Sequence, residues 1–366
     1  MNKIINVALS SYGMSGRIFH APFLQAHPWL NLAVIMERSK NESRQRYPAA
    51  RIARDYRDIL GDRSIGLVVI NTPNPLHYPM AKAALLAGKH VILEKPFTTT
   101  VAEGRELISL AQDKGLMLSV YHNRRLQSGF KTVQKLLAEK SLGNVKSCEI
   151  SIDRYRPQPG PKKWKEENNP GAGLLYDLGS HLLDEALMLF GQPQALCADL
   201  RIERDAGQAC DYFHVRLDYS EINGPKTNCP DTSAEANSSI RGCRIILKAS
   251  MLAREAAPAY VIHGDKGSYV KCGQDLQEER LAAGVCPTDP HWADEGESDW
   301  GILHTDSGRH KYPTVAGTYQ DYYDNIYRHL NAGEALLVTP EQALRVIEMI
   351  DLVQRSAREQ TCITLN

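Results

Sequence analysis

The fold is decided near the start of the chain, by the stretch Ile4-Ile5-Asn6-Val7-Ala8-Leu9-Ser10-Ser11-Tyr12-Gly13-Met14-Ser15-Gly16. Its apolar part, residues 4–9, predicts a β-strand, and a glycine-containing turn follows at once. A dinucleotide-binding fold needs a tight turn there, followed by a helix whose N-terminus meets the pyrophosphate. Gly13 and Gly16 occupy the second and third glycine positions of this fingerprint, and Ser11 takes the first. The candidate cofactor contacts in this turn are Ser11, Tyr12, Gly13, Met14, Ser15 and Gly16.

Alternating strands and helices continue from this stretch to about residue 120. Strands are expected at residues 4–9, 32–36, 66–70, 90–93 and 117–120. Helices are expected from near Ser15 and at residues 56–60, 76–87 and 101–114. This repetition predicts a parallel sheet covered by helices on both faces, which is a Rossmann-type domain over residues 1–122.

The pattern changes after Tyr121, where a second α/β domain is expected over residues 123–366. A helix is predicted at residues 130–139 and a last one at 341–357. Alternating segments predict strands at residues 145–152, 212–217, 245–251, 260–263 and 268–271. Alternation with long intervals indicates a mostly antiparallel sheet with one exposed face. The weakly hydrophobic stretch 220–242 predicts a long surface loop.

Charge and composition exclude several classes of protein. The 43 Lys+Arg and 43 Asp+Glu residues balance, so the basic footprint of a nucleic-acid-binding protein is missing. No apolar run reaches the ~20 residues that would cross a bilayer, and the N-terminus lacks a signal-peptide pattern. The eight cysteines form no Cys-x-x-Cys pair and do not have the spacing of zinc ligands. We therefore expect a cytoplasmic protein with reduced thiols, no metal, no nucleic acid and no membrane.

The end of the second predicted strand should carry the residue that reads the cofactor's ribose, about 20 residues after the turn. Glu37 can accept a hydrogen bond from the ribose hydroxyl of NAD. Arg38, Ser39 and Lys40 can instead hold the 2′-phosphate of NADP. Three donors beside one acid favour NADP, with NAD as the alternative; the third interpretation is a solvated loop.

Two more segments follow the carboxyl ends of predicted strands, where open α/β sheets bind ligands. One runs from Asn71 to His77, and the other is Glu94-Lys95-Pro96-Phe97. A lysine beside a proline at this edge is a candidate catalytic residue, against the alternative of an exposed surface lysine. The candidate cofactor contacts in these segments are Thr72, Pro73, Asn74, His77, Glu94 and Lys95.

A candidate acid–base pair lies in the second half. Asp177 and His181 are four residues apart and so share one face of a predicted helix. Histidine, with an unperturbed pKa of about 6.5, suits proton removal from an alcohol, and Asp177 can stabilise the charged imidazole. An ordinary structural Asp–His pair is the alternative. Gly179, inside the same helix, suggests close approach by another backbone or by a cofactor.

Two polar and aromatic clusters suit a polyhydroxylated substrate, unless they only decorate the surface. They are residues 121–125, at the domain junction, and residues 153–157, followed by Trp164. We take Asn123 as a further cofactor contact. The candidate substrate contacts are Arg124, Tyr155, Trp164 and Tyr176.

Taken together, these motifs resemble the glucose–fructose oxidoreductase/inositol dehydrogenase (Gfo/Idh/MocA) family. The resemblance rests on Tyr12-Gly13-x-x-Gly16 with Phe19-His20-Ala21-Pro22, on Glu94-Lys95-Pro96 and on Asp177-x3-His181. Within the family, residues 121–125, 153–157, 176–181 and 211–214 resemble the branch of NADP-dependent scyllo-inositol dehydrogenases. Ser11 and the order Glu37-Arg38-Ser39 depart from the family pattern.

The resemblance implies a Rossmann domain followed by an α/β domain with a large open sheet that commonly serves as an oligomer interface. It implies that Lys95, Asp177 and His181 meet at the nicotinamide, with His181 as proton acceptor and Lys95 positioning the reacting oxygen. We therefore expect hydride transfer between NADP(H) and a hydroxyl of an inositol or sugar-like polyol, in a homodimer or homotetramer. The alternatives are a non-catalytic NAD(P)-binding regulator and a reductase of another sugar or imine.

Overall fold

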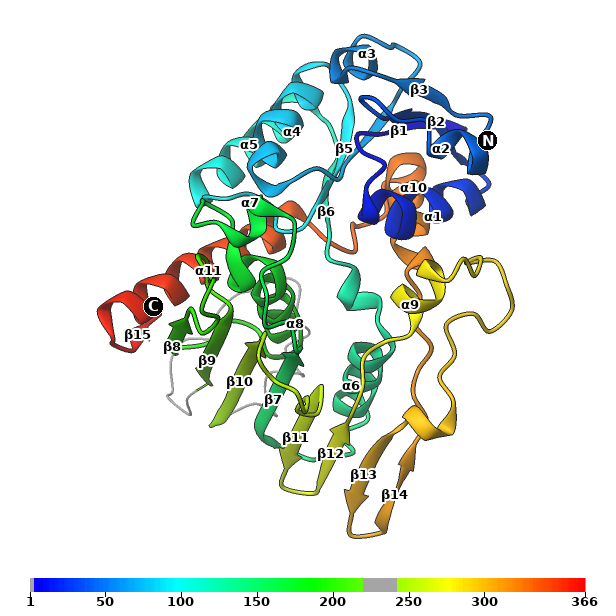
Figure 1. Cartoon of the computed structure of the whole chain (residues 1–366). Helices are drawn as coiled ribbons and strands as arrows, with labels where there is room; N and C mark the ends of the chain where they lie inside the picture. Colours follow the sequence, from blue (N-terminus) through cyan, green and yellow to red (C-terminus); the bar gives the residue numbers. More distant parts are fainter. Residues whose placement is uncertain (1–2, 220–241, 366) are drawn as a thin grey trace. The chain divides into compact units, whose positions relative to one another are not determined.

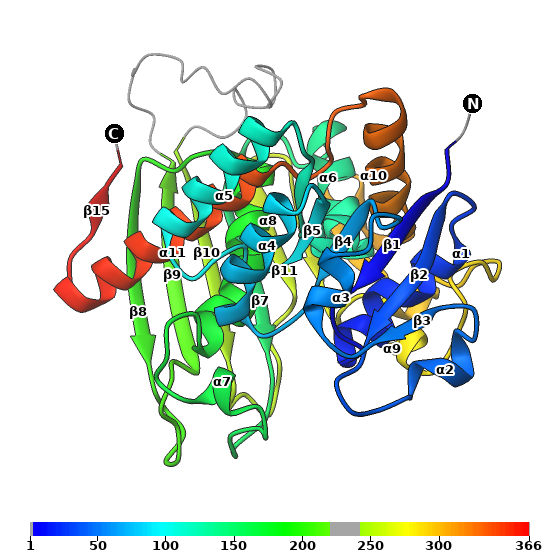
Figure 2. The same ribbon diagram turned by 90° about the horizontal axis from the view of Figure 1, so that it is seen from above.

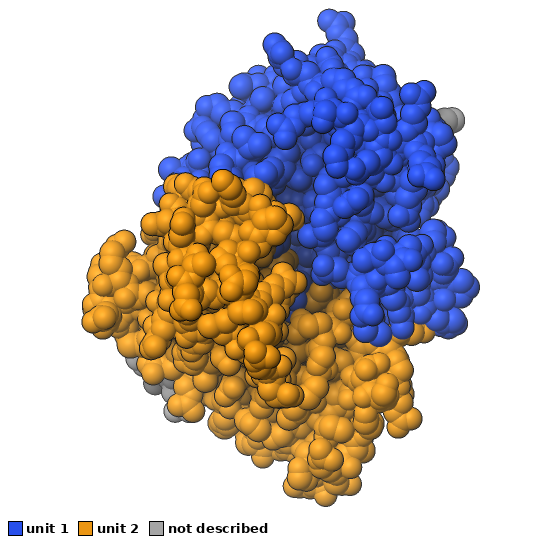
Figure 3. Space-filling model, in the orientation of Figure 1, with its two compact units in different colours: residues 1–126, 276–293, 318–347 blue, residues 127–275, 294–317, 348–366 orange. Residues whose placement is uncertain are grey.

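The computed structural model describes residues 3–219 and 242–365, which form two units. Unit 1 comprises residues 1–126, 276–293 and 318–347, and unit 2 comprises residues 127–275, 294–317 and 348–366 (Figure 3). Two late segments therefore complete the N-terminal unit. The surface loop predicted at 220–242 lies, apart from Gly242, outside the described residues. No helix in the described ranges is long and apolar enough to cross a membrane.

Unit 1 is built on a six-stranded parallel sheet with the strand order β3-β2-β1-β4-β5-β6 (Figure 1). This is the order of a dinucleotide-binding Rossmann fold, which confirms the predicted fold class. The strands are β1 (Ile5–Leu9), β2 (Leu30–Met36), β3 (Arg51–Ala53), β4 (Leu67–Ile70), β5 (His90–Glu94) and β6 (Leu118–Tyr121). All four residues of β4 are buried, as expected for a central parallel strand that is covered on both faces.

Two helices of unit 1 begin at residues whose side chains cap them. Asp55 caps α3 (Tyr56–Leu60) and Thr100 caps α5 (Val101–Lys114), each with an acidic residue that completes a capping box. The other helical segments are η1 (Gly16–His20), α1 (Ala21–Ala26), α2 (Ser43–Arg46), η2 (Asn74–Leu76), α4 (His77–Leu86), η3 (Asn123–Leu126), α9 (Gln277–Ala282) and α10 (Gln320–Ala332). Helix α4 packs against α5, and α1 packs against α10.

Unit 2 is built on a nine-stranded sheet with the order β14-β13-β12-β11-β7-β10-β9-β8-β15. Its central strands lie side by side in Figure 2. The strands are β7 (Val145–Asp153), β8 (Ala195–Arg201), β9 (Tyr212–Tyr219), β10 (Cys243–Ser250), β11 (Tyr260–Gly264), β12 (Gly267–Lys271), β13 (Gly301–Thr305), β14 (Gly308–Tyr312) and β15 (Ile363–Thr364). Strands β7 and β10 run parallel, and the remaining neighbours in the order are antiparallel. This confirms the predicted large, mostly antiparallel sheet.

The burial pattern of β9 shows why this sheet has two different faces. Phe213, Val215, Leu217 and Tyr219 are buried, and the residues between them are half-exposed. The helical segments described in this unit are α6 (Ser128–Ala138), α7 (Lys163–Glu166), η4 (Leu175–Gly179), α8 (Ser180–Phe190) and η6 (Glu297–Asp299). The last helix, α11 (Pro340–Glu359), has residues in both units.

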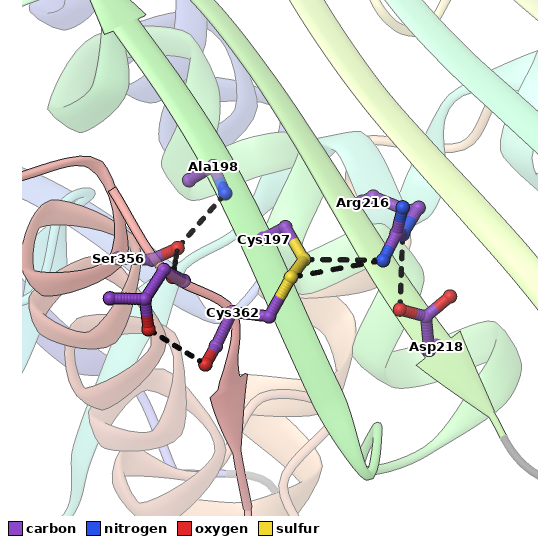
Figure 4. Close-up of a disulfide and its surroundings, with 7 residues drawn as sticks. Cys197, Ala198, Arg216, Asp218, Ser356 and Cys362 are labelled. Atoms are coloured by element: carbon purple, nitrogen blue, oxygen red, sulfur yellow. Dashed lines mark hydrogen bonds and ion pairs between the residues drawn. A yellow bond between two sulfur atoms is a disulfide. The ribbon is translucent and has the colours of Figure 1, made fainter. Parts of the chain in front are cut away.

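A disulfide joins Cys197 of β8 to Cys362, one residue before β15 (Figure 4). The expectation that all the cysteines are reduced thiols is therefore wrong for this pair. The antiparallel pairing of Leu196 with Ile363 brings the two Cα atoms to 4.4 Å, although 165 residues separate them in the chain. A contact between such distant strands leaves no spacing signal in the sequence.

This disulfide leads to a prediction about stability. Replacing Cys362 by serine should lower the free energy of unfolding by about 2 kcal/mol, because the link constrains the unfolded chain. Thermal unfolding without reductant measures the effect, and non-reducing peptide mapping should recover the linked peptides from the unmodified protein. The matched control is Cys272→Ser, at an exposed free cysteine. Equal melting temperatures for the two variants would contradict the prediction.

Candidate active site

The turn after β1 is held by hydrogen bonds and by the lack of a side chain at Gly16. The Gly13 N–H donates to the Ser11 hydroxyl at 3.3 Å, and Asn71 Nδ2 donates to the Ser11 carbonyl oxygen at 2.8 Å. A Cβ at Gly16 would collide with that carbonyl and lie 2.9 Å from Asn71 Nδ2. The turn therefore requires a glycine at position 16. Ser11 stands at the first glycine position of the fingerprint and stabilises the turn through its hydroxyl group. Asn71, at the end of β4, was missing from our candidate residues.

In the loop after β2, the carboxylate of the acidic residue Glu37 accepts hydrogen bonds from other residues of the same segment. Glu37 is buried, and its carboxylate accepts hydrogen bonds from the Glu42 N–H at 2.9 Å, the Ser43 N–H at 2.9 Å and the Ser43 hydroxyl. Burial alone would raise the pKa of Glu37, but the hydrogen bonds from Ser43 and Glu42 outweigh it and lower the pKa. Arg38 and Ser39 are exposed on the same loop. The arrangement leaves cationic and hydroxyl groups facing solvent where the ribose should lie.

The loop after β4 is tied to the loop after β5 by His77. This side chain is 1% exposed, and its two ring nitrogens lie 2.8 Å from the Pro96 carbonyl oxygen and 2.9 Å from that of Thr72. Burial lowers the pKa of His77. A neutral imidazole carries one N–H, so it donates to one of these carbonyls at a time. The described contacts of His77 are thus structural, and cofactor contact by Thr72, Pro73, Asn74 and His77 stays a prediction.

Glu94, the last residue of β5, fixes the backbone at Lys95. Its Oε1 lies 2.9 Å from His20 Nε2, and its Oε2 accepts a hydrogen bond from the Lys95 N–H at 3.1 Å. The other ring nitrogen of His20 lies 2.8 Å from the Tyr323 hydroxyl. Burial would raise the pKa of Glu94, but the hydrogen bond to His20 and the nearby charges outweigh it, and the pKa is lowered. Glu94 therefore acts on Lys95 as a buried anchor, with His20 and Tyr323 behind it.

The segment after β6 contains one structural arginine and one candidate. Arg125 Nη1 donates to the Leu337 carbonyl at 2.9 Å and to Gln342 Oε1 at 2.7 Å. Its neighbour Arg124 is half-exposed, and Asn123 is buried. The structure thus gives Arg125 a structural role and leaves the candidate Arg124 half-exposed.

In unit 2, the segment with Asp177 and His181 changes from a π-helical turn, η4, to the α-helix α8. Asp177 Oδ1 accepts a hydrogen bond from Lys165 Nζ at 2.7 Å, and His181 is 8% exposed. The nearest atoms to a Cβ at Gly179 belong to the side chains of Leu175 and Phe213. The nearest neighbours of this glycine are therefore side chains and not another backbone, and approach by a cofactor stays a prediction. Lys165, from α7, was not among our candidates.

The predicted substrate residues of unit 2 have different surroundings. Tyr155 is 41% exposed, and the Arg254 guanidinium lies 4.0 Å from its ring centroid while donating to its hydroxyl at 2.6 Å. The Lys165 ammonium lies 5.3 Å from the Trp164 ring. Tyr176 is buried at 7% exposure. Tyr155 and Trp164 therefore each present an aromatic plane with a cation above it.

The predicted residues fall into two groups, one in each unit. Unit 1 carries those that follow the carboxyl ends of β1, β2, β4, β5 and β6, among them Lys95, Asn123 and Arg124 (Figure 1). Parallel strands end at one edge of their sheet, so this group shares that edge. Unit 2 carries Tyr155, Trp164, Tyr176, Asp177 and His181. Within residues 3–219 and 242–365, no group of three His, Cys, Asp or Glu side chains could hold a metal ion.

Comparison with known families decides the assignment. Residues 5–122 match the GFO_IDH_MocA "Oxidoreductase family, NAD-binding Rossmann fold", and residues 134–365 match its "C-terminal alpha/beta domain". The chain belongs to the Gfo/Idh/MocA oxidoreductase family. It is an NAD(P)-dependent dehydrogenase that acts on CH–OH groups.

Relatives of similar length support this assignment. The chain is 36% identical to scyllo-inositol 2-dehydrogenase (NADP(+)) IolW of Bacillus subtilis, over 99% of this chain and 96% of that one. It is 38% identical to the uncharacterized oxidoreductase YdgJ of Escherichia coli, over 100% of both. A crystal structure of an oxidoreductase from Bacteroides fragilis, 44% identical, superposes with a TM-score of 0.87 over 99% of this chain and 100% of the other.

Proposed function

We propose that this family member transfers hydride between NADP(H) and a secondary alcohol or ketone of a cyclic polyol or sugar, as a scyllo-inositol dehydrogenase does. The full-length similarity to IolW, whose name states both an inositol substrate and NADP(+), carries the proposal. The chain has the lysine after β5 and the Asp–His pair that this chemistry needs. We further propose that it works in the cytoplasm as a homodimer or homotetramer.

The preference for NADP is supported by the loop after β2. In NAD-specific enzymes an acidic residue there binds the ribose hydroxyls. Here the carboxylate of Glu37 instead accepts hydrogen bonds from Ser43 and from the backbone N–H of Glu42. Arg38 and Ser39 are exposed beside it and supply the charge and the hydroxyl that a 2′-phosphate needs.

The proposed mechanism divides the work between groups of this chain. The nicotinamide, when bound, accepts or delivers the hydride. The Lys95 ammonium polarises and positions the reacting oxygen, and Glu94 holds the backbone beneath it. The His181 ring takes the hydroxyl proton as hydride leaves the carbon, and Asp177 stabilises the resulting imidazolium. Lys165, whose Nζ donates to Asp177 Oδ1 at 2.7 Å, holds that carboxylate in place.

Substrate recognition is proposed for side chains that combine hydrogen-bonding groups with flat apolar surfaces. A polyol ring presents hydroxyl groups at its edge and C–H groups on its faces. Arg124 supplies donors for the hydroxyl groups, and the aromatic planes of Tyr155 and Trp164 suit the faces. Tyr176 completes the proposed set from the turn that carries Asp177.

The experiment for the proposed function follows the absorbance of the reduced nicotinamide. The purified protein is offered inositol isomers and aldoses, each with NADP+ and with NAD+. We expect turnover of a cyclic polyol, with the higher kcat/KM for NADP+. A strong preference for NAD+ would overturn the cofactor proposal, and turnover of acyclic alcohols alone would overturn the substrate proposal.

Arg38 carries a separate prediction about cofactor choice. Arg38→Ala should lower kcat/KM with NADP+ about tenfold and leave the value with NAD+ almost unchanged, because one charge-assisted contact to the 2′-phosphate is lost. Steady-state kinetics with both cofactors measures the change. Arg63→Ala, at another exposed arginine of the same unit, is the control and should alter neither value. An equal loss with both cofactors would contradict the assignment.

A further inference from the structure

A cavity of about 490 Å³ opens in unit 1, lined by Tyr12, Arg17, Glu42, Gln45 and Arg46. Its volume falls in the range of small-molecule binding sites. Only Tyr12 among these residues was a candidate from the sequence. The other four belong to η1, to α2 and to the residue before α2.

The cavity adjoins both elements that frame the adenosine half of a dinucleotide. Tyr12 belongs to the turn that receives the pyrophosphate in this fold. Glu42 is the residue whose backbone N–H donates to Glu37, so it ends the loop that carries Arg38 and Ser39. A group that extends from the pyrophosphate toward the end of β2 therefore reaches this cavity.

The side chains of the cavity form a cluster of opposed charges. Arg17 Nη1 lies 3.7 Å from Glu42 Oε2, and Lys40 Nζ lies 2.6 Å from Glu42 Oε1. The Arg46 guanidinium lies 6.0 Å from the ring centroid of Tyr47. Two guanidinium groups thus line the space, and one carboxylate competes with any anion for them.

The charged side chains that line the cavity also act on the pKa of Tyr12. Burial raises the pKa of Tyr12, while the charges of Arg46 and Arg17 act to lower it and those of Glu37 and Glu42 act to raise it. The ring of Tyr12 meets that of Tyr47 edge to face, with centroids 6.1 Å apart. The two arginines therefore act on the tyrosine that lies beside the glycine-rich turn.

We propose that Arg17 and Arg46 bind the 2′-phosphate of NADP in this cavity, and that Glu42 holds Arg17 when no cofactor is bound. The inference rests on the proposed NADP preference and adds residues to it that lie outside the loop of Arg38 and Ser39. The Arg17–Glu42 ion pair is long and about half-exposed, so it contributes little free energy. Replacing Glu42 by a phosphate dianion as the partner of Arg17 therefore costs little. Guanidinium–phosphate hydrogen bonds are stronger, because both partners are charged and the geometry can be bidentate.

Glu42 gives this inference a prediction of unusual sign. Glu42→Gln removes the carboxylate that competes with the phosphate, so it should tighten NADP+ binding about threefold and leave NAD+ binding unchanged. Arg17→Ala and Arg46→Ala should each weaken NADP+ binding about tenfold, and NAD+ binding less than about twofold. Arg44→Ala is the matched control: Arg44 lies on the same short helix, is exposed, and does not line the cavity.

The test measures dissociation constants of NADP+ and NAD+ by calorimetry on the full chain. NAD+ binding by each variant shows that its Rossmann unit is intact, which separates loss of fold from loss of phosphate recognition. Tighter binding of NAD+ than of NADP+ by the unmodified protein would overturn the proposed cofactor itself. If the unmodified protein prefers NADP+ but Arg17→Ala and Arg46→Ala weaken both dinucleotides equally, or neither, only the role of the cavity is overturned.

Discussion

Replacing His181 by alanine should lower kcat by about two to four orders of magnitude, with NADP+ binding retained. The reason is that a positioned general base contributes about 10²–10⁴ to the rate of a proton-transfer step. In the proposed mechanism His181 acts on the hydroxyl proton of the substrate and does not bind the cofactor, so its loss should leave the cofactor's affinity unchanged. Single-turnover kinetics with the polyol found in the substrate screen, together with calorimetric NADP+ binding, measures both quantities.

A matched histidine variant separates the loss of a base from a general effect of mutation. His304, on β13, is exposed and belongs to the same unit, so His304→Ala should keep normal turnover. Partial recovery of the His181→Ala variant by added imidazole would support a role in proton transfer. Near-normal turnover in folded His181→Ala protein would remove this histidine from the mechanism.

The elements that the sequence predicted best are those with strong local signals. Helices α3 and α5 have their predicted bounds because Asp55 and Thr100 form capping boxes that mark their first turns. Strand β4 is four buried apolar residues, a run that favours a central parallel strand. In these elements, local propensity and tertiary packing agree.

The elements that the sequence did not predict depend on partners far along the chain. Strand β14 is mostly exposed and charged, and it forms because its backbone pairs with β13. Helix α10 buries Tyr322 and Tyr323 in unit 1, against residues that precede it by about two hundred positions or more, such as Ser119 and His20. The Cys197–Cys362 disulfide is of the same kind. Such contacts have no sequence spacing to reveal them.

The candidate site shows the same division. The glycine-rich turn and the Glu94-Lys95 segment were found because their positions after strands are readable from local patterns. Lys165 was missed because only the folded chain brings α7 to Asp177, and Asn71 was missed because its role is to join two turns. A side chain that acts by holding another leaves no motif.

Replacing Gly16 by alanine should weaken NADP+ binding about a hundredfold and also lower the stability of the free protein. The added Cβ would collide with the Ser11 carbonyl oxygen and press on Asn71 Nδ2, so the turn must move. Overpacking of this kind costs about 1–3 kcal/mol, and the upper part of that range corresponds to a factor of about 10² in a dissociation constant. Calorimetry with NADP+ and thermal unfolding without cofactor measure the two effects.

Gly13 offers a control that separates the two roles of glycine in this turn. The nearest atom to a Cβ at Gly13 is the Ser11 hydroxyl oxygen at 3.5 Å, which is ordinary contact, and the residue is exposed. Gly13→Ala should therefore keep the melting temperature of the free protein and weaken NADP+ binding alone, because the pyrophosphate approaches the backbone at this position. Equal melting temperatures for the Gly16→Ala and Gly13→Ala variants would show that the turn has room at Gly16, and would leave close approach of the cofactor as the only need for both glycines.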